Sequence, residues 1–241
     1  MRRTNRSRLL ILALFAIFPT FLKKPLYRIC FGYRIGKRVR IGFSIVDARQ
    51  CSIADDVRIG HLNIFTQVDN LNIDDHVRIG HLNIIRGGDE VSIGRYAEIM
   101  RMNEINSIPE PDAVNETDPR FLMGPGSIVT TGHKIDFTDR VEIGTRTIIG
   151  GRNSSIWTHN RQKTLPITIG SFAYVGSEIR MAPGSKIPSR SIVGMGAVVT
   201  SALDGENTLI GGVPAKVIKE LSNDDKFLIE RKTRPDLPDD V

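Results

Sequence analysis

The chain has 241 residues, enough for one solenoid or two small domains, and its apolar content of 40% is ordinary for a soluble globular protein. Its net charge of +6 is unevenly distributed: the first 40 residues hold eleven Lys or Arg and no acid, whereas the remainder holds 22 basic and 27 acidic residues, a net −5. The basic balance therefore belongs to the N-terminus, and we do not expect the acidic remainder to bind nucleic acid.

The first predicted element is an apolar helix between two groups of cations. Residues 9–22 (LLILALFAIFPTFL) form an apolar run that follows four arginines and precedes four further Lys or Arg. As a helix the run would be about 21 Å long, which is short of the roughly 30 Å hydrocarbon core of a bilayer. We therefore expect residues 1–34 to form an amphipathic segment that docks on an anionic membrane surface. The alternatives are a helix packed on the open end of the next domain, or a cleaved or spanning segment.

An apolar side chain then recurs at every sixth position, and a small residue mostly follows it. The longest unbroken series is Ile169, Val175, Met181, Ile187, Val193 and Val199. This period fits neither an α-helix nor an alternating strand, but it fits a coil of short strands that each give one side chain to an inner column. The segment VRIGHLNI occurs at 57–64 and again at 77–84, so successive coils repeat and bury their inner column against each other.

We expect this coil to run over residues 35–200, with two loop excursions. The first, at about 106–126, is rich in Pro and acidic residues, and the second, at 157–166, interrupts the repeat again. Loops on a rigid scaffold are where recognition tends to occur. Residues 201–241 are expected to form a C-terminal extension with a short helix and a frayed end.

The six-residue repeat, the closing segment GGVPAKVIKEL at 211–221 and a histidine-bearing loop ahead of ITIG at 167–170 resemble the hexapeptide-repeat acyltransferases. The resemblance covers about residues 35–220 and is closest to the sugar O-acetyltransferase branch, which includes maltose and galactoside acetyltransferases. It implies an all-β fold, a left-handed parallel β-helix of hexapeptide repeats with an N-terminal amphipathic helix and a short C-terminal helix. It also implies a homotrimer that uses acetyl-CoA as co-substrate and needs no metal ion.

The resemblance assigns the general base to His159, because acyl transfer to a hydroxyl needs a base near neutral pH. His133, one coil earlier in TTGHKIDF, is a second catalytic candidate, and Asp136 could orient it or contact the acceptor. Asn153 and Trp157 are candidate acceptor contacts, since an amide can read sugar hydroxyls and an indole face packs on a sugar ring.

The resemblance also implies a binding surface for acetyl-CoA. Gly176 would leave room for the pantetheine arm, and a donor at Ser177 could stabilise the tetrahedral oxyanion. Many family members carry a lysine where this chain has Ser201. The basic side chain near the CoA phosphates would instead be Lys216. The predicted CoA-binding residues are Gly176, Ser177, Met195, Thr200 and Lys216.

These features predict an acetyltransferase that acts on a sugar hydroxyl in a cell-surface polysaccharide or its lipid-linked precursor. We expect it to be cytoplasmic and peripheral on the inner face of the cell membrane, held there by residues 1–34. Two alternatives remain open: a metal enzyme of the γ-carbonic anhydrase type, suggested by His61, His76 and His81, and a non-catalytic solenoid scaffold. The repeat of VRIGHLNI by itself accounts for His61 and His81.

Overall fold

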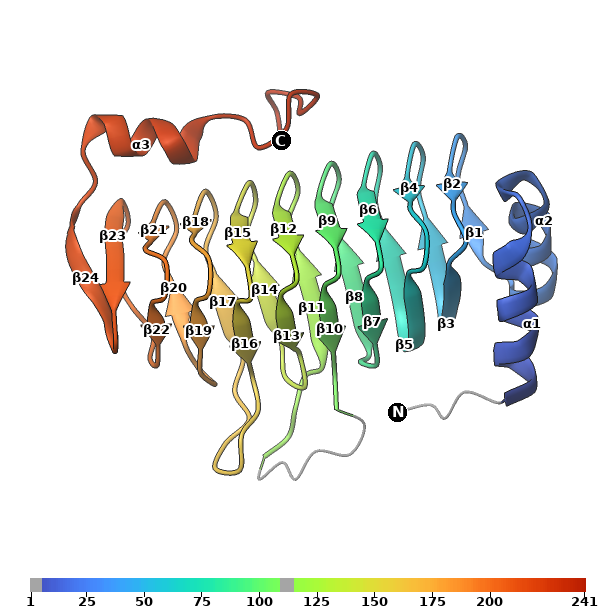
Figure 1. The fold of residues 1–241 in the computed structure, drawn as a ribbon, viewed down its shortest axis with the longest axis horizontal. Coiled ribbons are helices and arrows are strands. Elements are labelled where there is room, and N and C mark those ends of the chain that lie inside the picture. Colours follow the sequence, from blue (N-terminus) through green and yellow to red (C-terminus); the bar gives the residue numbers. More distant parts are fainter. Residues whose placement is uncertain (1–5, 109–114) are drawn as a thin grey trace.

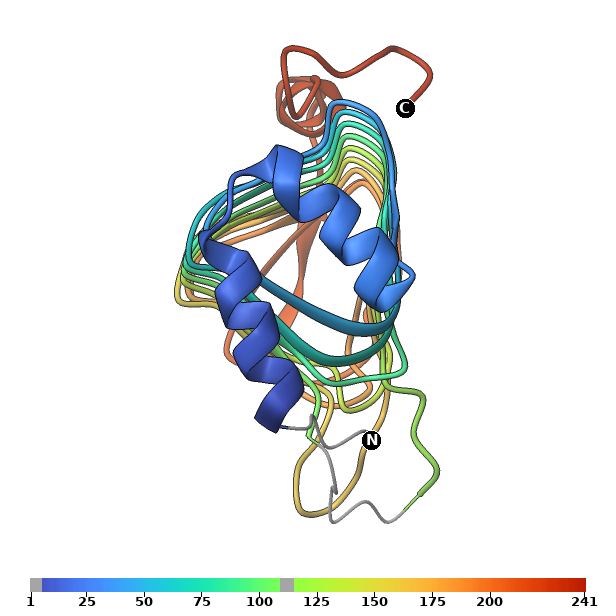
Figure 2. The same ribbon diagram turned by 90° about the vertical axis from the view of Figure 1, so that its right-hand side faces the viewer.

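The repeating coils form a parallel β-solenoid whose turns stack along one axis, with two helices on its N-terminal end and a third helix alongside the coils near the other end (Figure 1). The structure, a computed structural model, describes residues 6–108 and 115–241. Seen along the axis, the coils overlay one another in a roughly triangular outline (Figure 2). The predicted β-helix is therefore confirmed.

Each full coil contributes one strand to each of three faces, which we call the first, second and third face in chain order. The first face contains β1 (Arg34–Ile35), β8 (Glu90–Ile93), β11 (Arg120–Met123), β14 (Val141–Ile143), β17 (Ile167–Ile169) and β20 (Lys186–Ile187). The second face contains β2 (Arg40–Ile41), β4 (Arg58–Ile59), β6 (Arg78–His81), β9 (Glu98–Arg101), β12 (Ile128–Thr131), β15 (Ile148–Arg152), β18 (Tyr174–Val175), β21 (Ile192–Val193) and β23 (Thr208–Gly212).

The third face follows the second face in each coil and leads into the first face of the next coil. It contains β7 (Ile84–Arg86), β10 (Glu104–Asn106), β13 (Lys134–Asp136), β16 (Ser155–Trp157), β19 (Arg180–Met181) and β22 (Val198–Val199). Two long strands, β3 (Ile45–Ile53) and β5 (Ile64–Ile73), continue from the third face around the corner into the first. In the part of the chain that the structure describes, the second face has nine parallel strands, so the solenoid has about nine turns.

The core is the inner column that the six-residue repeat predicts. Every member of the series that begins at Ile169 and ends at Val199 is at most 2% exposed. Paired strands keep this column in register, with Ile59 opposite Ile79 and Val175 opposite Val193. Each coil thus buries its apolar side chains mainly against its two neighbours, as expected for a solenoid.

The N-terminal segment forms two helices that cover the open end of the solenoid (Figure 2). Helix α1 (Arg6–Ile17) and helix α2 (Thr20–Phe31) are separated at Pro19, and they bury Leu12, Phe15 and Tyr27 against the core. The N-terminal segment therefore packs on the open end of the solenoid, which is one of the alternatives that the sequence left open. None of the helices in the described part of the chain is long and apolar enough to cross a bilayer.

The β-structure continues beyond residue 200, where the sequence predicts its end. Strand β23 joins the second face, and β24 (Ala215–Glu220) pairs with it in the antiparallel direction. Helix α3 (Asn223–Glu230) begins at a capping box of Ser222 and Asp225. The tail then runs back along the solenoid, and the buried guanidinium of Arg234 donates to the His76 and Tyr96 carbonyls at 3.2 and 2.9 Å (Figure 1). The tail is therefore anchored to the solenoid.

Candidate functional site

Both loop excursions leave the third face at the same corner of the solenoid. The first lies between β10 and β11 and the second between β16 and β17, and both extend below the coils in Figure 1. Asn115 joins them, because its Nδ2 donates to the Thr164 carbonyl at 2.8 Å and its Oδ1 accepts from the Thr164 N–H at 3.3 Å. The first excursion returns at Arg120, earlier than predicted, since Phe121 and Met123 occupy the inner column. We call this corner the loop corner.

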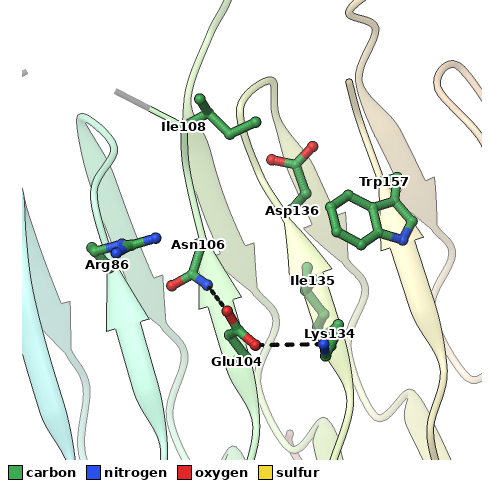
Figure 3. Close-up of a pocket in the computed structure, with 8 residues that line it drawn as sticks. All are labelled: Arg86, Glu104, Asn106, Ile108, Lys134, Ile135, Asp136 and Trp157. Carbon is green, nitrogen blue, oxygen red and sulfur yellow. Dashed lines mark hydrogen bonds and ion pairs between the residues drawn. The ribbon is translucent and has the colours of Figure 1, made fainter. Parts of the chain in front are cut away.

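A polar groove of about 200 Å³ lies on the third face at the base of the two loops (Figure 3). Its upper row is made by residues at equivalent positions of successive strands: Arg86, Asn106, Asp136 and Trp157. Below that row, Lys134 lies 3.9 Å from Glu104, whose other oxygen accepts from the amide of Asn106 at 2.7 Å. The groove thus combines a half-exposed indole with charged and amide groups, a composition suited to a polar ring such as a sugar.

Asp136 ties the second loop to the coil beneath it. Its Oδ2 accepts from the backbone N–H of His159 at 3.1 Å, and its Oδ1 accepts from the N–H and hydroxyl of Thr138 at 3.0 and 2.6 Å. Burial raises the pKa of the Asp136 carboxyl, and hydrogen bonds from Thr138 and Thr158, together with nearby His159, oppose that rise. Asp136 was predicted to contact the acceptor or orient His133, but its contacts hold the His159 loop.

His159 lies in the second loop, two residues beyond the end of the groove strand β16. It is half-buried and forms an isolated antiparallel bridge with Thr164. Its Nε2 is shielded from solvent and has no hydrogen-bond partner among the described residues. Buried polar atoms normally have a partner, so an imidazole nitrogen without one is available to a ligand. A ligand that reaches this nitrogen must first uncover it.

His133 lies at the other corner of the third face, which we call the ladder corner. Its Nδ1 accepts from the Ser154 N–H at 3.2 Å and its Nε2 lies 3.0 Å from the Thr130 hydroxyl. Its own N–H donates to the Asn103 side chain at 2.9 Å, and the residue is 1% exposed. Burial lowers the pKa of His133 to about 4, so the ring is neutral at pH 7. The structure thus separates His133 from the groove and gives both ring nitrogens partners in the fold.

Four other predicted residues lie along the ladder corner. Asn153 is exposed with a φ of +60°, and Met195 is 76% exposed. Gly176 is needed for stacking, because a Cβ there would lie 2.9 Å from the Met195 nitrogen. Ser177 is half-buried, and its carbonyl accepts from the N–H of Gly196 at 3.0 Å. The ladder corner therefore brings Gly176, Ser177 and Met195 together.

The two remaining predicted residues lie elsewhere. Thr200 follows β22 at the loop corner and is exposed, and Lys216 is exposed on β24 without an ion pair to any described residue. Asp136, Trp157 and His159, predicted for the acceptor side, thus lie at a different corner from Ser177, predicted for the donor side. A single chain does not bring the two groups together.

The histidines considered for a metal site have other partners. The rings of His61 and His81 stack with centroids 5.4 Å apart, and their Nδ1 atoms accept backbone N–H groups at 3.1 and 3.0 Å. His76 stacks on Tyr96 at another corner. Among the described residues, no group of three or more His, Cys, Asp or Glu is placed to hold a metal ion.

Comparison with known proteins finds relatives that match a short stretch of the chain and a solved structure with a similar fold. No family model matches the chain. The galactoside O-acetyltransferase of Escherichia coli K12 is 38% identical over 63 residues, 26% of this chain and 30% of that protein. The "Putative lipopolysaccharide biosynthesis O-acetyl transferase WbbJ" of the same strain is 37% identical over 61 residues, 25% and 31% of the two chains. The chain thus spans about a third of the length of these curated relatives.

One solved structure supports the fold assignment. The crystal structure named as a "putative acetyltransferase" of Bacillus cereus superposes with a TM-score of 0.50 at 20% identity, over 68% of this chain and 85% of that one. At that identity the likeness concerns the fold alone. With the repeat, it identifies the fold as the left-handed parallel β-helix of the hexapeptide-repeat transferases, and the chain is similar to O-acetyltransferases over about a quarter of its length.

Proposed function

We propose that this chain transfers an acetyl group from acetyl-CoA to a sugar hydroxyl, in a cell-surface polysaccharide or its lipid-linked precursor. The observation that carries the proposal is the unpaired Nε2 of His159, held in a loop above a groove that suits a polar ring. The names of the galactoside and lipopolysaccharide relatives support a sugar acceptor.

In the proposed reaction, His159 Nε2 takes the proton from the acceptor hydroxyl as its oxygen attacks the thioester carbonyl carbon. A donor near Ser177 stabilises the oxygen of the tetrahedral intermediate. When the carbon–sulfur bond breaks, the imidazolium of His159 returns its proton to the sulfur. The products are an O-acetyl ester and free CoA, so His159 ends in its starting state.

We place the acceptor in the groove on the third face. The half-exposed face of Trp157 would pack on the sugar ring. Lys134, Glu104 and Asn106 would exchange hydrogen bonds with its hydroxyls, since they offer both donors and acceptors. Asp136 holds the loop through the His159 N–H, so it would position the base and not the sugar.

We further propose that the active unit is a homotrimer. The acceptor-side residues lie at the loop corner, whereas Gly176, Ser177 and Met195 lie at the ladder corner of the same chain. Contact between the loop corner of one copy and the ladder corner of the next would close the site around the thioester. Exposed Lys216 stays a predicted CoA contact, whereas Thr200, at the loop corner, would lie on the acceptor side of this cleft.

The N-terminal cap suggests a location on the cytoplasmic face of a membrane. One side of each helix packs on the solenoid end, but the other side leaves large apolar side chains exposed: Leu10 73%, Leu14 56%, Ile17 68% and Phe21 72%. In the sequence, the first 40 residues contain eleven Lys or Arg and no acid. We propose that the apolar surface enters the interface of an anionic membrane, as amphipathic anchors do.

The reaction is tested by incubating the protein with acetyl-CoA and a panel of sugar nucleotides and lipid-linked glycans, with product detection by mass spectrometry. We expect an acetylated sugar from the parent protein and from His133→Asn, but only trace product from His159→Ala. His133→Asn is the matched control, because it also removes one imidazole, from the other corner of the same face. Acetyl transfer by His159→Ala at the parental rate would refute the proposed base.

A further inference from the structure

Two arginines beside the N-terminal cap form no ion pair within the part of the chain that the structure describes, although Arg58 lies near enough to Asp56 to act on it electrostatically. Arg40, Arg58 and Arg78 occupy equivalent positions on β2, β4 and β6, and neighbouring strands lie about 4.8 Å apart. Arg78 is neutralised by Asp236, at 2.6 Å. Arg40 and Arg58 are both exposed, and neither forms an ion pair with any residue that the structure describes. Two adjacent unpaired guanidinium groups favour a multivalent anion such as phosphate.

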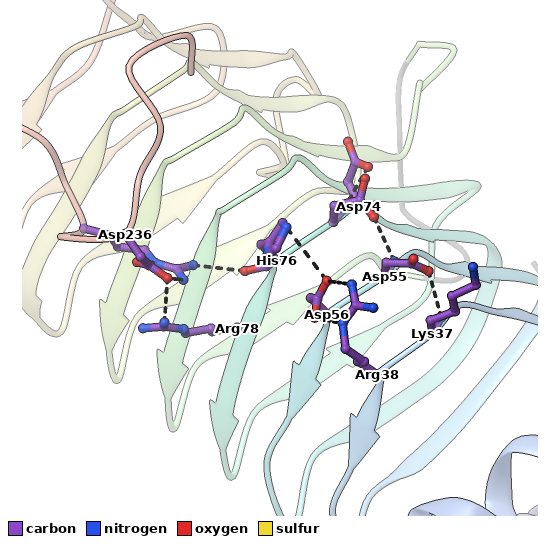
Figure 4. Close-up of polar contacts among 10 residues, drawn as sticks. Lys37, Arg38, Asp55, Asp56, Asp74, His76, Arg78 and Asp236 are labelled. Carbon is purple, nitrogen blue, oxygen red and sulfur yellow. Dashed lines mark hydrogen bonds and ion pairs between the residues drawn. The ribbon is translucent and has the colours of Figure 1, made fainter.

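The acids near this row are already occupied (Figure 4). Both oxygens of Asp56 receive hydrogen bonds from Arg38, at 2.6 and 2.5 Å, and these bonds hold the pKa of Asp56 below its usual value. Asp236 is shared between Arg78 and Arg234. The recess that these side chains line has a volume of about 240 Å³ and contains five arginines but only two carboxylates. It therefore retains a positive charge.

An apolar cleft of about 370 Å³ adjoins the arginine row where the cap meets the second face. It is lined by Phe18 and Pro19 from the turn between the cap helices and by Phe43 from the first coil. Lys23 also lines the cleft, but it is buried. Its ammonium donates to the carbonyl oxygens of Ile41 and Gly42, so its hydrogen bonds are directed into the fold. Phe43 itself is 53% exposed, so the cleft offers apolar surface to a ligand from outside.

Arg40 lines both the cationic recess and the apolar cleft. A ligand that spans the two must therefore carry an anion next to an apolar chain. We propose that Arg40 and Arg58 bind the phosphate of an anionic membrane phospholipid, while the cleft between the cap and Phe43 receives the start of its acyl chain. This inference rests on the proposed membrane docking and deepens it, because it sets the N-terminal end of the second face, in addition to the cap helices, against the membrane.

The experiment is flotation of the full chain with vesicles of phosphatidylcholine alone or with one third phosphatidylglycerol. Deletion of residues 1–34 is not suitable, because it would expose the core that Leu12, Phe15 and Tyr27 cover. The test variant is Arg40→Gln/Arg58→Gln, which removes two charges from exposed side chains. The matched control is Lys186→Glu, which changes the net charge equally at an exposed position on β20, toward the other end of the solenoid.

We expect the double variant to bind phosphatidylglycerol vesicles about 30-fold more weakly, since each arginine near an anionic surface contributes about 1 kcal/mol. Lys186→Glu should stay within about twofold of the parent. Equal weakening by both variants would overturn the site, because only net charge would matter. Release of the parent from vesicles by inorganic phosphate, at constant ionic strength, would assign the arginines to a soluble phosphate and overturn the lipid assignment.

A third variant separates this site from membrane docking itself. Phe21→Asp places a charge on the exposed apolar side of the cap, where Phe21 is 72% exposed, and should weaken vesicle binding without unfolding the protein. Loss of binding in Phe21→Asp with parental binding in the double variant would retain the docking surface and refute the phosphate site. Parental binding in both variants would refute both proposals.

Discussion

The two corners that border the third face use their polar side chains in opposite ways. At the ladder corner the coils stack with one register shift, between β12 and β15, and buried asparagines bond to the neighbouring coils, although the buried Ser154 hydroxyl has no partner among the described residues. Asn83, for example, donates to the Asn63 side chain at 2.9 Å and to the Met100 carbonyl at 3.1 Å, and its oxygen accepts twice from Asn103. His133 continues that ladder. The asparagines and His133 at the ladder corner are therefore already hydrogen-bonded within the fold.

At the loop corner the chain leaves the coil twice, and the regular partners are absent. The Nε2 of His159 is buried without a hydrogen bond to any described residue, and Trp157 remains 45% exposed. The comparison shows that stacking consumes hydrogen-bonding capacity, while an interruption of stacking leaves it for a ligand. The two histidines thus differ in their partners because they lie at different corners.

Replacing His159 with alanine is expected to have the largest effect on the loop corner. Loss of a general base should lower kcat by about 10²–10⁴-fold. The melting temperature should change little, since the ring is half-buried and its Nε2 has no hydrogen bond to a described residue. Steady-state kinetics and thermal unfolding measure the two effects. A lower melting temperature with unchanged kcat would make His159 a packing residue and remove the contrast between corners.

The ladder corner should respond to pH through His133. Its pKa is about 4 in the folded protein and about 6.5 when unfolded, so the unfolded chain takes up the proton first as the pH falls. The part of the free energy of unfolding that depends on the neutral His133 ring is largest above pH 6.5 and declines toward pH 4. The decline between pH 7 and pH 5 is about 2 kcal/mol. Urea unfolding at the two pH values measures this change.

His133→Asn would extend the asparagine ladder and should remove that part of the pH dependence. Acetyl transfer at pH 7 should stay within about twofold of the parent, because the ring nitrogens of His133 already have partners in the fold. A folded His133→Asn protein without activity would place His133 in the reaction, as the sequence predicts.

Asp136 connects the coil to the reactive loop, and its substitution tests that connection. In Asp136→Asn one acceptor oxygen becomes an amide donor, which cannot accept both the His159 N–H and the Thr138 hydrogen bonds. We expect kcat to fall about tenfold with an unchanged KM, because the base is misplaced while the amide of nearly equal size keeps the shape of the groove. A rise in KM alone would instead make Asp136 an acceptor contact, the role that the sequence suggests.

The smallest expected effect concerns the indole at the loop corner. Trp157→Ala should raise the KM for the sugar about fivefold, since the loss of stacking costs about 1 kcal/mol. Trp157→Phe retains an aromatic face and should recover most of the affinity. Titration of the sugar under saturating acetyl-CoA measures both. Equal KM values for all three proteins would exclude Trp157 from acceptor binding.

Much of the scaffold could be predicted because its signal is local in sequence. An apolar residue at every sixth position specifies a short strand, an inward side chain and a turn, whatever the neighbouring coil contains. The ends of the solenoid were harder to predict. The break at Pro19 makes two cap helices, and β23 and β24 extend the sheet beyond residue 200, because pairing with an existing edge overrides a weak repeat.

The sequence by itself determined the β-helix, its two excursions and the histidine at the centre of the second loop. Only the tertiary structure decided which polar residues share a corner. The hydrogen bonds of Asn103 with His133 and of Asp136 with His159 join residues 30 and 23 positions apart. Such pairs depend on coil length and stacking register, and a residue's corner, more than its type, decides whether it serves the fold or remains free for a ligand.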